Sequence, residues 1–328
     1  MADSALTVPE LQAAQTTNYV AVAAGALVAY DQVLTFSQEF DHIWNRQWNF
    51  TTALYLVARN FGSLSVIGIA ALWICINWTY SVNVNMFLAV TWAENIFLLT
   101  MQAILVIRVY ALFNRSRRVL VFLATFYALQ TTATFVMTAL LFNNRALHEY
   151  IGSVSPAIGS VTQAVNTNAS PFLPIAQDST VVSVVFNTVL LFFALWAFVR
   201  HALEARAMDG GWSINVLVRT LVADHLVYFV CSLTWLSLTL AVDYATEPEL
   251  NVSVILLNDA ASAFTALTVV AGPRMVISLR AVENKARREG VILGGSLSTI
   301  RFAIQEPPTQ SERVTEIRGA TDEDGEYE

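Results

Sequence analysis

The chain has 328 residues, of which 55% are hydrophobic and 13% are charged, and its formal net charge is −7. A soluble domain carries about 25% charged residues, so this composition argues against a soluble protein and indicates one that lies in a lipid bilayer. No basic domain or nucleic-acid motif is visible, which argues against nucleic acid as a partner. Both cysteines, Cys75 and Cys231, lie in apolar runs and argue against an extracellular disulfide framework.

Seven stretches of the chain are long and apolar enough to cross a membrane, which takes about 20 mostly apolar residues. They predict an all-α bundle of seven transmembrane helices. The predicted spans are 18–36, 52–76, 85–112, 118–142, 180–200, 216–242 and 252–273.

The arginines between the spans predict the orientation of the bundle. Arg46, Arg115 and Arg200 mark the loops that follow the first, third and fifth spans, whereas the segments 77–84 and 243–251 contain no basic residue. Lys and Arg close to span ends are retained in the cytosol. We therefore expect the N-terminus outside and the C-terminus in the cytosol.

This orientation divides the chain into an extracellular segment at 1–17, a membrane domain at 18–280 and a cytosolic tail at 281–328. Aromatic residues at nearly helical spacing predict a short interfacial helix over 37–50. Residues 281–289 are basic and can continue the last span. The acidic, apolar-poor tail beyond residue 307 is expected to be disordered.

The outer segment between the fourth and fifth spans, 143–179, is rich in Ser, Thr, Asn and Pro. It contains Asn168 in an Asn-x-Ser sequence, which makes this asparagine the best candidate for glycosylation.

Asp31 and Arg59 are ionisable residues inside the first and second spans, where an unpaired charge is costly. Both are close to the predicted inner side, and consecutive spans are usually neighbours. We expect them to form a buried ion pair. We interpret this pair as a structural clamp that fixes the packing register of the two spans more than it stabilises the fold.

Glu94 and Asn95 in the third span and Asn258 and Asp259 in the seventh span place polar groups in the predicted outer half. If the two helices face one another, they form a ligand site for a cation, a proton or a hydroxyl-rich molecule. Two carboxylates at close range repel, so one of them is then expected to hold a proton. The alternative is ordinary hydrogen bonding between spans.

Arg108, Arg219, Asp224 and His225 lie in the predicted inner half of the third and sixth spans and form a candidate inner polar cluster. Arg108 is expected to reach the inner interface, either as a topological anchor or as a conformational latch. A structural role is favoured for the other three over a proton relay.

Motifs of known enzymes are absent. Lys285 is the one lysine and lies outside the spans, which excludes a retinal Schiff base, and there is no HExxH, GxSxG or P-loop sequence. The four histidines are scattered, which argues against a zinc site. We expect no catalytic activity, no cofactor and no metal.

One segment, 19–61, resembles a domain of unknown function found near the N-terminus of many basidiomycete membrane proteins. Further strings later in the chain resemble recurring strings of the same proteins. The residues that carry the resemblance are Tyr30-Asp31, Leu34-Thr35, Glu39, Ile43-Trp44, Trp48, Leu54-Tyr55-Leu56 and Arg59, then Arg108-Val109-Tyr110-Ala111-Leu112, Arg115-Ser116-Arg117-Arg118 and Gly272-Pro273-Arg274. The resemblance implies a seven-pass, receptor-like architecture and brings no substrate or catalytic residue.

The layout is also similar to that of G-protein-coupled receptors, although Ile107-Arg108-Val109 replaces their DRY string and NPxxY is missing. The leading hypothesis is a receptor-like, non-enzymatic protein of the plasma membrane with an unknown ligand and a cytosolic signalling partner. A transporter or channel for a small solute or ion is the first alternative, and a scaffold without a ligand is the second.

Overall fold

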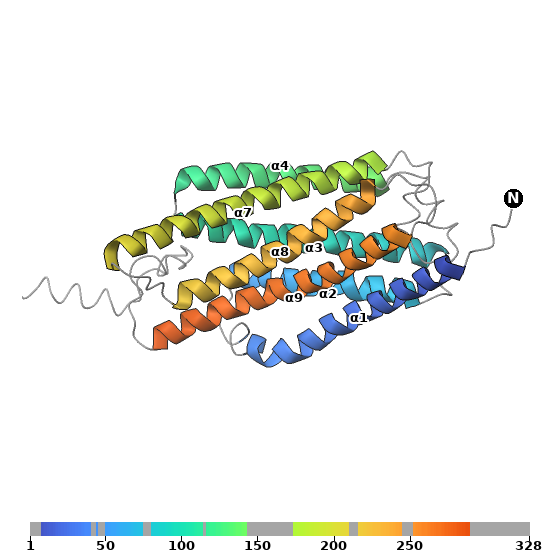
Figure 1. Ribbon diagram of the computed structural model, residues 1–328, viewed down its shortest axis with the longest axis horizontal. Coiled ribbons are helices and arrows are strands. Elements are labelled where there is room, and N and C mark those ends of the chain that lie inside the picture. Colours follow the sequence, from blue (N-terminus) through green and yellow to red (C-terminus); the bar gives the residue numbers. More distant parts are fainter. Residues whose placement is uncertain are drawn as a thin grey trace, which may run out of the picture. The chain divides into compact units, whose positions relative to one another are not determined.

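A computed structural model describes residues 8–40, 44, 50–74, 80–113, 116–142, 173–209, 216–244 and 252–288. In these residues the regular secondary structure is helical, and seven long α-helices lie alongside one another (Figure 1). In chain order they are α1 (Val8–Glu39), α2 (Phe50–Ile74), α3 (Tyr80–Leu112), α4 (Arg117–Phe142), α7 (Leu173–Asp209), α8 (Val216–Tyr244) and α9 (Val252–Arg288).

Six of these helices are long and apolar enough to cross a membrane, as expected for a polytopic membrane protein. Their apolar segments are Gln15–Glu39, Phe50–Leu72, Val84–Leu112, Arg117–Leu140, Thr180–Ala197 and Ile255–Ser278. On α8 the described apolar segment is shorter, at Leu226–Val242.

Helix ends differ from the predicted span ends where a helix continues past the apolar stretch. The prediction ended the last span at residue 273, but α9 continues through Pro273 to Arg288. It thereby includes most of the basic segment 281–289. The interfacial helix predicted over 37–50 lies largely outside the described residues, as do Asn168 and the tail beyond residue 288.

The helices form a ring in which each packs on its neighbours along the chain, and α9 closes the ring by packing on α1. In addition, α2 contacts α9, and α3 contacts α7 across the ring. Successive helices run in opposite directions. The side on which α1, α3, α7 and α9 end is called the Glu39 end, and the opposite side the Thr17 end.

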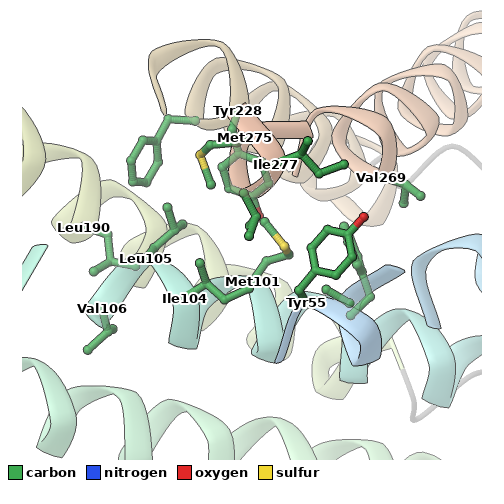
Figure 2. Close-up of a cluster of buried hydrophobic side chains, with 14 of the residues drawn as sticks. Tyr55, Met101, Ile104, Leu105, Val106, Leu190, Tyr228, Val269, Met275 and Ile277 are labelled. Carbon is green, nitrogen blue, oxygen red and sulfur yellow. The ribbon is translucent and has the colours of Figure 1, made fainter. Parts of the chain in front are cut away.

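The centre of the bundle is an apolar layer in which α2, α3, α8 and α9 meet. Figure 2 shows Met101 of α3 between Tyr55 of α2 and Tyr228 of α8, with Met275 of α9 close by. Each of these side chains is at most 2% exposed. Since these side chains fill the space between the helices densely, this layer holds the four helices in register.

Gly62 lets α2 approach both α3 and α9 closely. A Cβ atom added at this position would lie 2.8 Å from Cδ2 of Phe97 and 3.1 Å from Cγ1 of Val269. The Phe97 ring is fully buried and has little room to move. Small residues at helix crossings serve the same purpose in membrane proteins generally.

The substitution Gly62→Ala should therefore lower the thermal stability of the purified protein, at a cost of about 1–3 kcal/mol for overpacking. The control is the double variant Gly62→Ala with Phe97→Leu, in which a smaller and more flexible side chain makes room for the added methyl group. Thermal unfolding in detergent should show that the double variant loses less stability than the sum of the losses in Gly62→Ala and Phe97→Leu. Simple additivity would contradict the close approach.

Candidate functional site

Asp31 on α1 and Arg59 on α2 form an ion pair inside the bundle. Nη1 of Arg59 lies 2.8 Å from Oδ2 of Asp31, and the two side chains are 7% and 2% exposed. The pair forms because α1 and α2 pack side by side in opposite directions. The structure thus brings together the two residues that were expected to pair.

Arg59 also binds a second carboxylate of α1, that of Glu39. Its Nε lies 2.8 Å from Oε1 of Glu39, and its Nη2 donates a hydrogen bond to the hydroxyl of Thr35. Asp31, Thr35 and Glu39 are spaced four residues apart, so they lie on one face of α1 and span about 12 Å along its axis. The donors of one guanidinium fan out over this face, a geometry that Lys does not offer.

Arg274 on α9 completes the arrangement. Its Nη2 lies 2.6 Å from Oδ1 of Asp31, so each oxygen of this carboxylate receives a different guanidinium. The Arg274 side chain is 53% exposed, whereas that of Asp31 is 2% exposed. We call Asp31, Glu39, Arg59 and Arg274 the ionic network.

The ionic network contains two carboxylates and two guanidiniums, so its formal charges balance. Balance matters because a buried charge without a partner costs several kcal/mol, while a complete buried pair adds little net stability over an apolar one. The network thereby favours the arrangement in which α1 packs against both α2 and α9.

The sequence analysis predicted the pairing of Asp31 with Arg59 but did not assign Thr35, Glu39 or Arg274 to the same site. The spacing of Asp31, Thr35 and Glu39 at intervals of four was the available signal for a shared helix face.

Arg108 links α3 to the same part of α9. Its Nη2 donates to the backbone carbonyl of Met275, at 3.4 Å, and the Ser278 hydroxyl donates to the same carbonyl, at 3.1 Å. Arg108 therefore binds α9 at Met275, the residue that follows Arg274 of the ionic network. The side chains of Arg219, Asp224 and His225, which were expected to join Arg108, lie outside the described residues.

Glu94 and Asp259 are both turned at least partly inward, and Asp259 is 5% exposed. Their surroundings differ. Thr17 of α1 lies beside the Asp259 carboxyl, whereas Leu98, one turn along α3 from Glu94, packs against α8 and α9.

The packing register also separates the two carboxyls in depth. Because Met101 lies opposite Gly272, Glu94 lies opposite about residue 265, six residues past Asp259. This offset corresponds to about 9 Å along the helix axis. Within the described residues no contact joins the two carboxyls, and a shared ligand site stays a prediction.

The described contacts of the two asparagines that accompany these carboxyls differ. Asn95 donates from Nδ2 to the hydroxyl of Thr138 on α4, at 3.3 Å, and the backbone carbonyl of Asn258 accepts a bond from Ser262. For Asn95, the described contact is thus interhelical hydrogen bonding. Among the described residues, no three His, Cys, Asp or Glu side chains are grouped so that they can hold a metal ion.

Comparison with known proteins identifies one family. The model of a family of unknown function, DUF6533, matches residues 19–64. The matched segment contains Asp31, Glu39 and Arg59, and thus the α1 and α2 part of the ionic network. No curated protein and no solved structure matches the chain.

Loss of Arg59 should damage the protein more than loss of Asp31. In Arg59→Met, Glu39 loses its cationic partner inside the bundle, which is expected to cost about 3–5 kcal/mol. In Asp31→Asn, Arg59 keeps Glu39 and Thr35, and the half-exposed Arg274 can be hydrated, so the loss should be smaller. Denaturant unfolding of the reconstituted protein measures both.

The matched control is the double variant Arg59→Met with Glu39→Gln, which removes the unpaired carboxylate. It should recover part of the stability lost in Arg59→Met, so that the two changes are not additive. Additive effects, or equal damage from Asp31→Asn and Arg59→Met, would mean that Arg59 does not bridge the two carboxylates.

Proposed function

We propose that this protein is a receptor-like, non-enzymatic protein that crosses the plasma membrane seven times. In this proposal the Thr17 end is extracellular and the Glu39 end is cytosolic. The span that adds to the six apolar segments described above is α8, which has 29 residues and a length of about 43 Å, more than the roughly 30 Å of the hydrocarbon core.

The orientation rests on the distribution of arginine. Arg117 and Arg118 at the start of α4 and Arg200 near the end of α7 are exposed at the Glu39 end. Arg274 is at the same end, on α9. Arginines close to span ends favour the cytosolic side.

The observation that carries the proposal is the way in which α9 is held at the Glu39 end. Arg274 can leave Asp31 without leaving an unpaired carboxylate, because Asp31 keeps Arg59 and because the Arg274 side chain is itself half exposed at the surface of the bundle. The contact between α9 and α1 is therefore reversible without stranding a buried charge. A reversible contact at the cytosolic end of a helix is the kind of two-state element that a receptor uses.

The apolar layer supports a receptor over a transporter or channel. It places the fully buried side chain of Phe97 against Gly62, between Glu94 and the level of Arg59. A transporter needs a polar path from one face to the other, and a packed apolar layer interrupts such a path. The ligand is then expected to enter from the Thr17 end, in the half that contains Glu94 and Asp259.

A scaffold without a ligand is the remaining alternative, in which the ionic network only fixes helix packing. The two readings differ in one respect. A scaffold needs the contact between Arg274 and Asp31 to persist, whereas a receptor needs it to open when the partner or ligand binds.

The topology predicts that a tag placed at the C-terminus survives protease added to sealed, right-side-out cells. A tag at the N-terminus should be removed under the same conditions. Both tags should be cut once the membrane is permeabilised. Loss of the C-terminal tag from intact cells would reverse the orientation.

Coupling to a cytosolic partner can be tested by a pull-down between the purified protein and a heterotrimeric G-protein α subunit, the partner class suggested by the architecture. We expect the wild type to bind, and Arg274→Gln to bind severalfold more strongly because α9 is released from α1. The matched control Arg118→Gln removes an exposed arginine of the same end that is outside the ionic network, and it should bind like the wild type. Absence of binding by every form, together with solute flux in proteoliposomes, would favour the transporter.

A further inference from the structure

The exposed residues of α9 lie on one face of the helix. Among the residues of α9 whose side chains are described, the exposed ones are Leu256, Ala263, Leu267 and Arg274. An α-helix turns by about 100° per residue, so the first three positions lie within about 20° of Arg274 around the helix axis. We call this stripe the exposed face of α9. It is apolar over most of the bundle and ends on a cation.

Beyond Arg274 the same face continues into the basic part of α9. The segment after Ser278 contains four basic residues and one acidic residue: Arg280, Lys285, Arg287, Arg288 and Glu283. Helical spacing places positions 285 and 288 within about 40° of Arg274, whereas positions 280, 283 and 287 are about 120–180° away. In this segment the exposed face therefore carries two positive residues, and the one acidic residue is on the opposite side.

The guanidinium of Arg274 has donors that the ionic network does not use. Its Nε and Nη2 both bind one oxygen of Asp31, Oδ1, each at 2.6 Å. Among the described residues no contact of Nη1 is present, and half of the side chain is exposed. Because a guanidinium carries five N–H donors, Arg274 can bind a second anion at the surface of the bundle while it stays on Asp31.

The positions of these cations along α9 match the edge of a bilayer. The apolar segment of α9 ends at Ser278, four residues or about 6 Å beyond Arg274. An arginine at this depth reaches toward the lipid headgroups. Positions 285 and 288 lie about 10 and 15 Å beyond Ser278, where the headgroup layer of about 5–7 Å meets water.

We propose that the exposed face of α9 binds an anionic phospholipid of the surrounding bilayer. The acyl chains lie along the apolar part of this face, at Leu267, and the headgroup lies at Arg274, Lys285 and Arg288. An anionic headgroup fits because it meets three cations, whereas a zwitterionic headgroup brings a cation of its own. The proposal does not depend on the receptor function or on which side of the membrane the Glu39 end faces.

Native mass spectrometry of the full-length protein in detergent can measure the affinity for individual lipids. The lipids to compare are a phosphatidylinositol bisphosphate, phosphatidylserine and phosphatidylcholine. At least one of the two anionic lipids should bind about tenfold or more tightly than phosphatidylcholine, because basic residues next to a membrane attract anionic headgroups. This preference should fall as the salt concentration rises. Equal affinity for all three lipids would overturn the proposal.

The two sides of the basic segment provide a matched pair of variants. Lys285→Gln with Arg288→Gln removes two charges from the exposed face and should lower the affinity for the anionic lipid severalfold. Arg280→Gln with Arg287→Gln removes the same charge from the other side of the helix and should bind like the wild type. Equal losses in the two double variants would mean that net charge alone decides, and the site on the exposed face would be wrong.

A soluble inositol phosphate tests whether the apolar part of the exposed face takes part in binding. It offers the phosphate groups of the inositol lipid without the acyl chains, so it should bind severalfold more weakly than the lipid. Binding as tight as that of the lipid would assign the surface to a free anion and would contradict a lipid site.

Discussion

The guanidinium of Arg59 is the group on which the arrangement at the Glu39 end depends. A permanently charged side chain that is 7% exposed has to be surrounded by acceptors, and α1 provides three of them on one face. This requirement determines the rotation of α1 about its axis. A rotation by one residue, about 100°, would turn Asp31, Thr35 and Glu39 together away from Arg59. The same requirement also determines the depth of α2, since Arg59 has to reach two carboxylates about two turns apart.

Close packing of the backbones makes this geometry possible. Gly25 on α1 faces Ala70 on α2, where an added Cβ would lie 3.0 Å from the Ala70 Cβ. Further along, Gln32 donates from α1 to the hydroxyl of Ser63 on α2. The two helices therefore meet through small and polar residues along their length, and the charged contacts form at one end of an interface that is already narrow.

Much of the fold could be predicted from the sequence, because apolar length and the cost of exposed backbone groups in lipid leave few alternatives to a helical bundle. The Asp31–Arg59 contact could be inferred for a similar reason: a charge inside a span needs a partner, and neighbouring spans are the first place to find one. Arg274 could not be assigned in this way, since it is 243 positions from Asp31 in the sequence and only the closure of the ring by α9 and α1 brings it there.

The depth of Glu94 relative to Asp259 was equally hidden from the sequence. Counting residues from the predicted span ends gave similar depths, but the offset between two helices is determined by how their side chains interlock. Here Met101 lies against Gly272, and a difference of six residues follows.

Pro273 has a mechanical consequence for the part of α9 at the Glu39 end. Because proline has no amide hydrogen, the carbonyl of Val269 lacks its normal helical partner, and the helix bends more easily at this point than elsewhere. Directly beside it, Gly272 rests on the end of the flexible Met101 side chain, which can yield under a small displacement. From Pro273 to Arg288 is about 22 Å of helix, so a tilt of about 10° at this pivot displaces the tip by about 4 Å. The last four turns of α9 thus form a lever that pivots at Pro273 and carries Arg274 directly beside the pivot.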